Sequence, residues 1–265
     1  MLNIQNAEKK FIQYSEKFDL KNKNIKMKQL HSIRVMKLCE KIAKEINLNR
    51  EEINLAKLIG LLHDIGRFKQ YEKCKTYIDR ESFDHGDYGE TMLKKDNHIE
   101  KFIEDKKDIE ILLKAIKNHN KYKIQEGLKE EELKYAKLIR DADKIDILYE
   151  ATDIFWNNLE EKNQMENSTI SEETEKQFFR EVNIKSRGSK ETKADNLVKI
   201  ISFIYDINYK ASLKIIKEEK YIDKIIDRFE FKDKETKEKM IKVRIKANEY
   251  IEKNIKDDKN WAKNY

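Results

Sequence analysis

The fold of this chain depends on one stretch of sequence, Leu58-Ile59-Gly60-Leu61-Leu62-His63-Asp64-Ile65-Gly66-Arg67-Phe68. Its first residues continue an apolar run without a polar face, which predicts a helix that is buried on most sides. His63 and Asp64 follow at the inner end of that helix, where burial of two ionisable groups is costly unless a partner compensates them. A divalent metal ion is a common partner; the alternative interpretation is a hydrogen-bonded core histidine beside a helix-terminal aspartate. We expect Gly66 to end the helix.

The composition predicts an all-α fold. The 265 residues include no proline and only six glycines, and Leu, Ile, Lys and Glu, which are abundant, favour helix. The 57 Lys and Arg residues nearly balance the 51 Asp and Glu residues, leaving a net charge of +6. These charges are interleaved along the chain, which predicts solvated helix surfaces rather than a nucleic-acid-binding patch.

The sequence carries no signal for export or membrane insertion. Cys39 and Cys74 do not make a disulfide framework, which favours a reducing compartment. The first residues lack the basic and apolar regions of a signal peptide. No run approaches the ~18 apolar residues that a membrane span needs. We therefore expect a soluble cytoplasmic protein without a membrane partner.

Apolar residues at helical spacing run through the chain. Helices are predicted over residues 4–18, 26–46, 51–62, around 109–116, and over 130–149, 155–159, 172–184, 194–220 and 234–255. A polar stretch after Phe68 carries Tyr71, Tyr77 and Phe83, whose rings either stack on a nucleobase or pack the loop. We divide the chain into a metal-binding helical domain, 1–150, and a C-terminal helical extension, 151–265, packed on the same unit.

Further polar residues fall at or beside apolar helix faces. His31 lies next to the buried stripe of its helix, and His119 continues the inward face of another. His85 begins a helix, and Asp143 is an acid within an apolar stripe, where it needs a counter-charge. The alternative roles are a core histidine for His31 and a surface capping residue for His85. His98 stands among polar residues and is expected at the surface.

These residues suit a divalent metal centre. Imidazole and carboxylate ligands are typical of iron, manganese, zinc, cobalt or nickel. One ion would take His31, His63, Asp64 and Asp143, and a second would share Asp64 and take His85 and His119. Two such ions polarise a phosphoryl oxygen and acidify a bridging water, which gives a hydroxide nucleophile near neutral pH. We therefore expect one or two divalent ions per chain.

The order His, His-Asp-Ile-Gly, His, His, Asp resembles the HD-domain superfamily of metal-dependent phosphohydrolases. The matching segments are His31-Ser32-Ile33-Arg34-Val35, His63-Asp64-Ile65-Gly66-Arg67, Asp84-His85-Gly86 and Arg140-Asp141-Ala142-Asp143-Lys144-Ile145-Asp146. The resemblance covers roughly residues 27–148. It implies an HD-domain helical bundle with the metals at its centre and the C-terminal helices as an extension. It also places His31, His63, Asp64 and Asp143 at the core metal site, and His85 and His119 at the additional site of two-metal members.

Two departures from the family narrow the resemblance. Arg67 stands where HD-GYP phosphodiesterases carry a phosphate-contacting lysine, but a chain without proline cannot hold the Gly-Tyr-Pro element, which counts against cyclic di-GMP hydrolysis. Many two-metal members have a His-His pair where this chain has Asn118-His119. The second site is therefore expected to be weaker, or to fill only with substrate.

We assign roles to four further groups by their charge. Asp64 is expected to act in catalysis through the metals, and Arg67 and Lys144 to neutralise phosphate oxygens. Lys144 has an alternative role in holding a ligand carboxylate in place. Arg34 is a further substrate-binding candidate, whose alternative is a salt bridge between helices.

The predicted function is hydrolysis of a phosphoester or phosphoanhydride in a nucleotide or another small phosphorylated metabolite. One alternative is a diiron oxygenase, because the six-ligand pattern also resembles inositol oxygenase and the phosphonate-cleaving enzymes of the superfamily. The other is a binding module that the metal stabilises without turnover. The missing basic cluster counts against long nucleic acid as a substrate. The sequence defines neither the substrate nor the oligomeric state.

Overall fold

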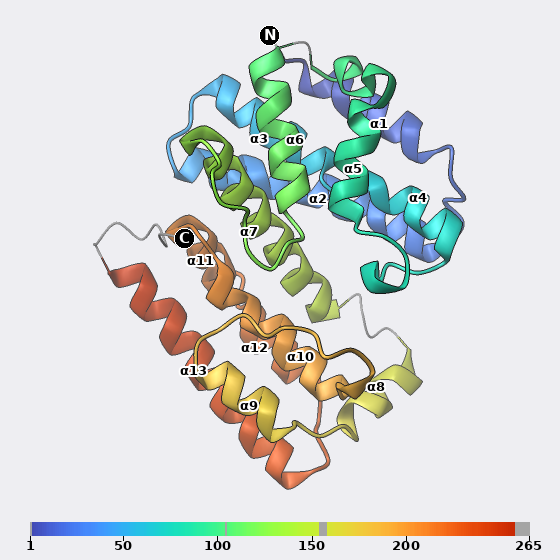
Figure 1. The fold of residues 1–265 in the computed structure, drawn as a ribbon. Helices are drawn as coiled ribbons and strands as arrows, with labels where there is room; N and C mark the ends of the chain where they lie inside the picture. The colour runs from blue at the N-terminus through green and yellow to red at the C-terminus, as the bar shows by residue number, and fades with distance from the viewer. Residues whose placement is uncertain (1, 104, 154–157, 258–265) are drawn as a thin grey trace. The chain divides into compact units, whose positions relative to one another are not determined.

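The computed structural model describes residues 2–103, 105–153 and 158–257, and every regular element in these ranges is a helix (Figure 1). The predicted all-α fold class is confirmed. The chain divides into two compact units, residues 1–143 and 144–264. The sequence-based division at residue 150 falls close to this boundary, and the packing of the extension on the first domain stays a prediction.

The first unit is built around α3. Its elements are α1 (Ile4–Ser15), α2 (Lys23–Glu45), α3 (Arg50–Leu62), α4 (Ile65–Cys74), η1 (Asp79–Glu81), α5 (His85–Lys94), η2 (Lys95–Lys101), α6 (Lys106–Asn118) and the first half of α7 (Glu130–Asp153). Helix α3 packs against α1, α2 and α6, and α5 packs against α4 and α6 (Figure 1). A capping box between Asn49 and Glu52 begins α3. The helix that the sequence predicted to be buried thus lies at the centre of the unit.

Gly60 sets the spacing between α2 and α3. A Cβ atom at this position would lie 2.8 Å from Cys39 Sγ and 2.9 Å from Met36 Cα. No side chain fits there, so glycine is what lets the two helices approach this closely. This contact holds His31 of α2 beside His63 at the end of α3.

Gly66 does not end a helix, as the sequence predicted, but lies in the first turn of α4. Helix α3 ends at Leu62, a short turn follows, and α4 continues to Cys74. A Cβ atom on Gly66 would lie 2.7 Å from the carbonyl oxygen of His85. Close packing of α4 on α5, rather than a helix terminus, therefore requires this glycine. The predicted irregular stretch is correspondingly shorter and begins after α4.

The second unit consists of α8 (Leu159–Glu166), α9 (Glu172–Phe179), η3 (Gly188–Lys190), α10 (Lys193–Ile201), η4 (Ser202–Asp206), α11 (Lys210–Glu218), α12 (Tyr221–Asp227) and α13 (Lys234–Lys256), together with the second half of α7. Helix α13 packs against α9, α11 and α12, and its bounds match the predicted helix 234–255. None of the described helices is both long and apolar enough to cross a membrane. The predicted helical residues Phe155 and Trp156 lie outside the described residues.

The single helix predicted over residues 194–220 is wrong. It divides into α10, η4 and α11, with Ile207 in extended conformation. Ser202 Oγ donates to the carbonyl of Lys199 at 2.7 Å, and Asn208 Nδ2 donates to the carbonyl of Asp206. These short polar side chains compete with the helical hydrogen bonds and interrupt an apolar pattern that otherwise continues.

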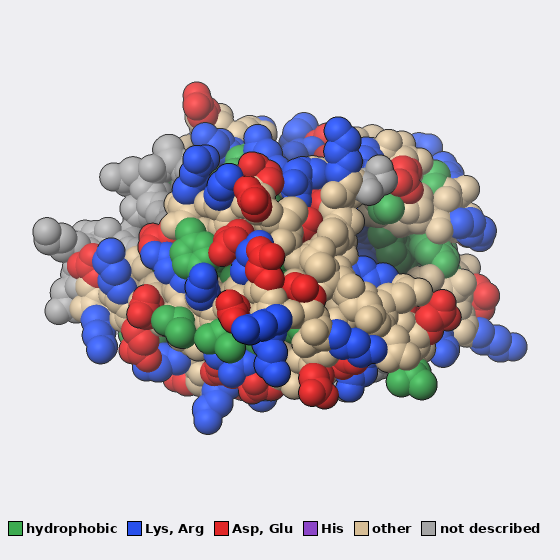
Figure 2. All heavy atoms as spheres, turned by 90° about the horizontal axis from the view of Figure 1, so that it is seen from below, with side chains coloured by type: hydrophobic (Ala, Val, Ile, Leu, Met, Phe, Trp, Pro, Cys, Tyr) green, Lys and Arg blue, Asp and Glu red, His purple; other side chains and the backbone are tan. Residues whose placement is uncertain are grey.

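The surface charges are mixed. Lys and Arg side chains alternate with Asp and Glu side chains across the face shown in Figure 2. This matches the interleaved charges of the sequence.

Candidate metal centre

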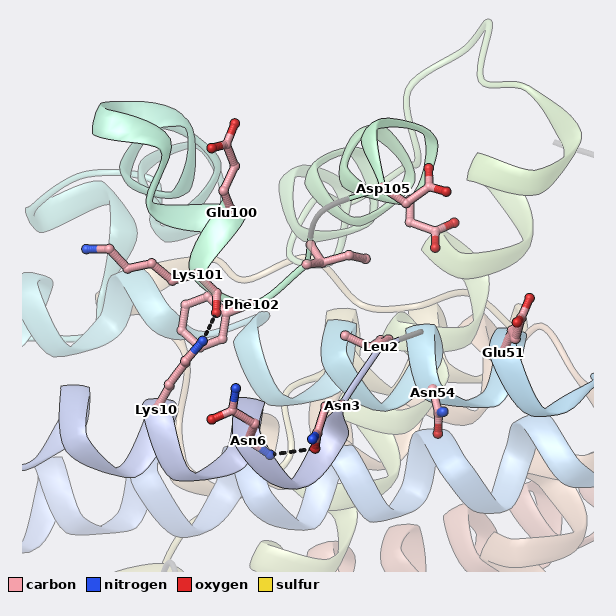
Figure 3. Close-up of a pocket in the computed structure, with 12 residues that line it drawn as sticks. Leu2, Asn3, Asn6, Lys10, Glu51, Asn54, Glu100, Lys101, Phe102 and Asp105 are labelled. Atoms are coloured by element: carbon pink, nitrogen blue, oxygen red, sulfur yellow. Dashed lines mark hydrogen bonds between the residues drawn. The ribbon is translucent and has the colours of Figure 1, made fainter.

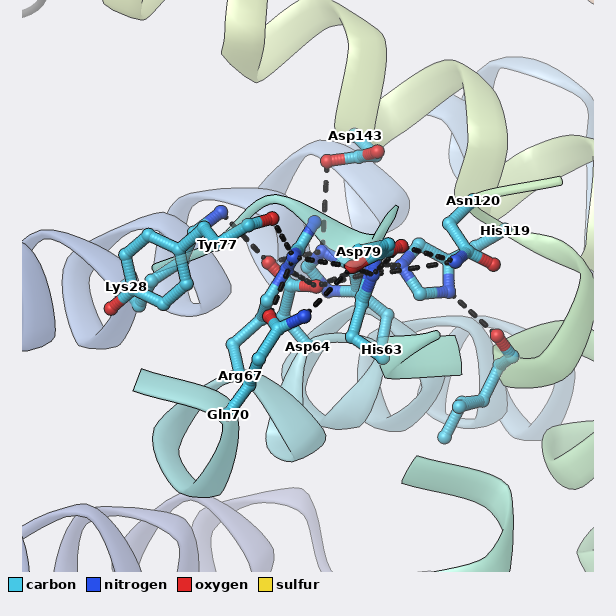
Figure 4. Close-up of polar contacts among 12 residues, drawn as sticks. Lys28, His63, Asp64, Arg67, Gln70, Tyr77, Asp79, His119, Asn120 and Asp143 are labelled. Carbon is cyan, nitrogen blue, oxygen red and sulfur yellow. Dashed lines mark hydrogen bonds and ion pairs between the residues drawn. The ribbon is translucent and has the colours of Figure 1, made fainter. Parts of the chain in front are cut away.

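The six side chains predicted as metal ligands lie together in the first unit (Figure 4). They come from five places: His31 from α2, His63 and Asp64 from the turn after α3, His85 from the start of α5, His119 from the end of α6, and Asp143 from α7. The four imidazoles and Asp64 are at most 4 % exposed, and the Asp143 side chain is 17 % exposed. Asp143 was expected to be buried; its partial exposure opens one side of the cluster to solvent.

Four donor atoms form the first group. His31 Nε2 lies 3.1 Å from His63 Nε2, 3.5 Å from Asp64 Oδ2 and 3.2 Å from Asp143 Oδ1. His63 Nε2 lies 3.7 and 3.6 Å from the same two oxygens. Two donors about 2.1 Å from one ion lie roughly 3.0–3.4 Å apart at octahedral or tetrahedral angles. His31, His63 and Asp64 lie close enough together to hold a single divalent ion, and Asp143 Oδ1 lies beside the two imidazole nitrogens.

Three donor atoms form the second group. His85 Nε2 lies 3.0 Å from His119 Nε2, and these nitrogens lie 3.3 and 3.5 Å from Asp64 Oδ1. Asp64 thus directs Oδ2 to the first group and Oδ1 to the second. A carboxylate in this position could serve two ions at once, and the bridging role of Asp64 stays a prediction.

Hydrogen bonds fix the orientation of three of the imidazoles. Nδ1 of His63 donates to the carbonyl of Gly60 at 2.8 Å, and Nδ1 of His119 donates to that of Ile116 at 2.6 Å. Nδ1 of His85 donates to Asp79 Oδ2 at 2.7 Å. In the neutral rings Nε2 then carries a lone pair, and the lone pairs of His85 and His119 face each other. A cation between them removes this repulsion, and such bonds at Nδ1 are usual for metal-bound histidines.

The environment keeps Asp64 and Asp143 charged and His63 and His85 neutral. Burial alone would raise the pKa of Asp64, but Lys28, His63, His119 and Arg67 together hold it well below its usual range. Burial lowers the pKa of His63 despite the nearby carboxylates. Burial and the charge of Arg67 lower the pKa of His85 to about 4. These are the protonation states that metal ligands need.

Arg67 lies beside Asp64, as its predicted role requires. Its Nε is 3.6 Å from Asp64 Oδ1, and its Nη1 donates to the carbonyl of Tyr77 at 2.6 Å and to Asp79 Oδ1 at 2.9 Å. Nε is buried and makes no hydrogen bond to the described part of the chain. The guanidinium is thus held in place with a donor turned to the centre.

The other two predicted substrate-binding residues lie differently. Lys144 Nζ is 2.9 Å from Asp206 Oδ2, and both side chains are about 8 % exposed. This ion pair lies within the second unit, so phosphate contact by Lys144 stays a prediction. Arg34 is half-buried on α2, one turn after His31, and its role also stays a prediction.

Sequence reasoning missed two charged residues of the centre. Lys28 Nζ lies 2.9 Å from Asp64 Oδ2. It precedes His31 by one helical turn, and this spacing was a signal that could have found it. Asp79 accepts hydrogen bonds from His85, Arg67, Gln70 and Asn120. It stands in a loop without periodicity, so no pattern in the sequence marked it.

Arg140 anchors the end of α6 and with it His119. Its side chain is 2 % exposed, and Nη1 donates to the backbone carbonyls of Asn118 at 3.1 Å and His119 at 3.3 Å, and to that of Lys121. These are carbonyl groups that a helix end leaves without partners, and a guanidinium satisfies several at once.

The aromatic residues of the loop pair with one another. The rings of Tyr71 and Tyr77 are 4.9 Å apart, and those of Phe83 and Tyr88 are 4.5 Å apart. These contacts support packing of the loop over stacking on a nucleobase. His98 lies apart from the cluster in η2, where its Nδ1 donates to the carbonyl of Lys95.

A separate polar pocket of about 330 Å³ lies in the first unit beside α1 (Figure 3). Its charged lining residues are Lys10, Glu51, Glu100, Lys101, Asp105 and Asp108. Lys10 is tied to the carbonyl of Lys101. None of the residues predicted for the site belongs to this lining.

Comparison with known proteins agrees with this geometry. The model of the HD domain family matches residues 30–148, which contain all six side chains of the cluster. Searches of curated proteins and of solved structures gave no match. The resemblance inferred from the motifs is therefore confirmed over this segment, since residues 30–148 match the HD domain family.

Proposed function

We propose that this protein hydrolyses a phosphoester or phosphoanhydride bond in a nucleotide or another small phosphorylated metabolite. The observation that carries the proposal is the position of Asp64, whose two oxygens face two separate groups of imidazole nitrogens. Paired divalent ions supply a polarised phosphoryl oxygen and a water that is a nucleophile near neutral pH.

The side chains of the centre have distinct tasks in this reaction. His31, His63 and Asp143 hold one ion, and His85 and His119 the other. Asp64 would be a ligand of both ions, since its two oxygens face the two groups. Arg67 places a donor beside Asp64 Oδ1, where it stabilises negative charge on a phosphate oxygen.

The test is a screen of phosphorylated metabolites with manganese, iron and cobalt. We expect release of inorganic phosphate or a phosphorylated product in the presence of at least one of these ions. His31→Ala should abolish turnover, whereas His98→Ala, which changes a histidine outside the cluster, should leave it intact. Binding of the ions without hydrolysis of any compound in the panel would contradict the proposal.

The diiron oxygenase is the second candidate, because the same six side chains are the ligands that its pattern requires. Protein loaded with iron under anaerobic conditions would then consume oxygen, and manganese-loaded protein would show no phosphatase activity. The positive charges of Lys28 and Arg67 next to Asp64 favour an anionic substrate, which suits a phosphate ester and counts against a neutral polyol. The binding-module alternative requires that divalent ions raise thermal stability through His31 while the protein hydrolyses no compound in the panel.

A further inference from the structure

Two positively charged side chains flank the same carboxylate on one side of the centre. Lys28 Nζ lies 2.9 Å from Asp64 Oδ2, and Arg67 Nε lies 3.6 Å from Asp64 Oδ1. In the view of Figure 4, Lys28 lies to one side of Asp64, and His119 to the other. The lysine thus contacts one oxygen of this carboxylate, and the nitrogens of the second group face the other.

Lys28 is poorly explained as a residue that only holds Asp64. In the part of the chain that the structure describes, Asp64 is its one ion-pair partner. A positive charge at this place repels divalent ions and competes with them for the carboxylate oxygen. A neutral donor would hold the carboxylate without that cost. The positive charge of the ammonium group becomes favourable when an anionic ligand binds beside it.

The tyrosine ring between the two cations is fixed. Lys28 Nζ and Arg67 Cζ lie 5.5 and 5.7 Å from the centroid of the Tyr77 ring, within the range of cation–π contacts. Tyr77 Oη donates to the carbonyl of Asn24 at 3.1 Å, and Asn24 Nδ2 donates to Tyr71 Oη at 2.6 Å. The loop that carries Tyr77 is therefore tied to the start of α2, on the helix that carries Lys28.

Both cations are mostly desolvated but can still be reached. The side chain of Lys28 is 15 % exposed and that of Arg67 is 14 % exposed. Charges withdrawn from water to this degree interact strongly with a bound anion, and the more so the greater its charge. A terminal phosphate carries about −1.5 to −2 charges at pH 7, because its second pKa is near 6. A phosphodiester carries a single negative charge.

We propose that Lys28 binds the substrate phosphate and, together with Arg67, makes the centre selective for terminal phosphate groups over phosphodiesters. The substrate class is thus a phosphomonoester or the end of a phosphoanhydride chain. This inference rests on the proposed hydrolase function and adds to it a residue and a substrate class.

Binding of inorganic phosphate tests the role of Lys28 without turnover. With Mn²⁺ at saturation, calorimetry should show Lys28→Ala binding phosphate about tenfold to a hundredfold more weakly than the unchanged protein. Lys28→Arg should restore most of the affinity. The matched control is Lys37→Ala, which removes an exposed lysine from the same helix and should bind phosphate as the unchanged protein does.

The affinity for Mn²⁺ separates substrate binding from a structural role. We expect Lys28→Ala to bind Mn²⁺ as tightly as the unchanged protein or more tightly, because a competing cation is gone. If Lys28 only positions Asp64, Lys28→Ala should instead bind Mn²⁺ more weakly and bind phosphate normally once Mn²⁺ is saturating. That result would overturn the inference.

Hydrolysis of p-nitrophenyl phosphate and bis(p-nitrophenyl) phosphate tests the substrate class. The unchanged protein should prefer the monoester, and Lys28→Ala should lower kcat/KM for the monoester about tenfold while changing that for the diester by less than about twofold. If the unchanged protein prefers the diester, or if Lys28→Ala lowers kcat/KM equally for both compounds, the inference about Lys28 is wrong while the proposed hydrolase function still stands. If the unchanged Mn²⁺-loaded protein neither binds phosphate nor hydrolyses either ester, the proposed function fails with it.

Discussion

At the scale of single residues, Asp64 carries the most contacts in the centre. Its oxygens face four imidazole nitrogens and two cationic side chains. The burial that would protonate it is more than offset by these neighbours, which hold its pKa well below the usual range. The side chain therefore stays a carboxylate anion in the folded protein at neutral pH.

Asp79→Asn should weaken metal binding at the second group. Asp79 accepts the Nδ1 proton of His85, and the hydrogen bond makes the ring a better ligand and fixes its orientation. Loss of such a partner costs about tenfold to a hundredfold in metal affinity. Titration with Mn²⁺, followed by calorimetry, should show the weaker of two binding events shifted by this amount and the tighter one unchanged.

The control for this variant is Glu81→Gln, which removes an exposed carboxylate from the same short helix. It should leave both binding events as they are. Equal behaviour of Asp79→Asn and Glu81→Gln would show that the orientation of His85 does not depend on Asp79.

The metal-free protein should become less stable as the pH falls from 7 to 5. The folded-state pKa of His85 is lowered to about 4 by burial and Arg67, and burial also lowers that of His63. The unfolded chain therefore takes up protons below its histidine pKa of about 6.5 that the folded chain does not. Below that pH, the free energy of unfolding should decrease by about 1 kcal/mol per pH unit for His85 alone.

Urea unfolding in the presence of EDTA measures this dependence. His85→Gln should show a smaller decrease between pH 7 and pH 5, since it removes one of the groups responsible. If the urea concentration at the midpoint of unfolding stays constant or rises as the pH is lowered from 7 to 5, the buried histidines are already protonated in the folded protein.

The six candidate ligands could be predicted from the sequence, but the loop residues that contact them could not. His31, His119 and Asp143 stand at helical spacing from apolar residues, so periodicity alone turns them inward. Asp79 and Tyr77 lie in a loop, where no period relates a residue to its position in space. Their contacts with the centre follow only from the path of the loop between α4 and α5.

At the scale of the elements, the approach of neighbouring helices places the ligands. Gly60 lies against the backbone of α2, and Gly66 lies against the carbonyl of His85 in α5. Each pair of helices contributes one ligand from either side of its contact. A change in either spacing would move two ligand groups apart.

Gly60→Ala and Gly89→Ala should have opposite effects on stability. The new methyl group at Gly60 would lie 2.9 Å from Met36 Cα, which cannot move without α2. This overpacking should lower the free energy of unfolding by about 1–3 kcal/mol. At Gly89, inside α5, the nearest atom is Ile116 Cγ2 at 3.4 Å, and alanine should raise stability by about 0.5–1 kcal/mol.

Thermal unfolding of the two variants side by side makes the comparison. Since both changes replace a helical glycine with alanine, they share the same gain in helix propensity and differ in the space available. Stabilisation of Gly60→Ala would mean that α2 and α3 do not pack this closely.

The positions of most helices could be predicted, and the errors share one cause. Apolar spacing located α2, α3, α7 and α13, whose buried faces are continuous over many turns. It failed between α10 and α11, where buried Ser202 and Asn208 donate to the nearby backbone carbonyls of Lys199 and Asp206. The sequence also indicated the wrong role for Gly66. A glycine that is required by close packing of a neighbouring helix cannot be told apart, in a sequence, from a glycine that ends the helix it belongs to.

At the scale of the whole molecule, the cluster lies in the first unit and joins segments from α2 to α7. Ions bound to it link these segments in the folded state only, so they should stabilise the protein in proportion to their affinity and concentration. Differential scanning calorimetry should show a higher Tm in Mn²⁺ than in EDTA. At a Mn²⁺ concentration one hundred times Kd, binding should add roughly 2.7 kcal/mol to the free energy of unfolding. His31→Ala should remove most of this difference, and a Tm that does not respond to any divalent ion would contradict it.

The most direct measurement is anomalous diffraction from crystals grown with Mn²⁺. The account predicts two anomalous peaks on either side of the Asp64 carboxylate, one bound by His31, His63 and Asp143 and the other by His85 and His119. A single peak that Asp64 does not share, or no peak among these six side chains, would contradict it.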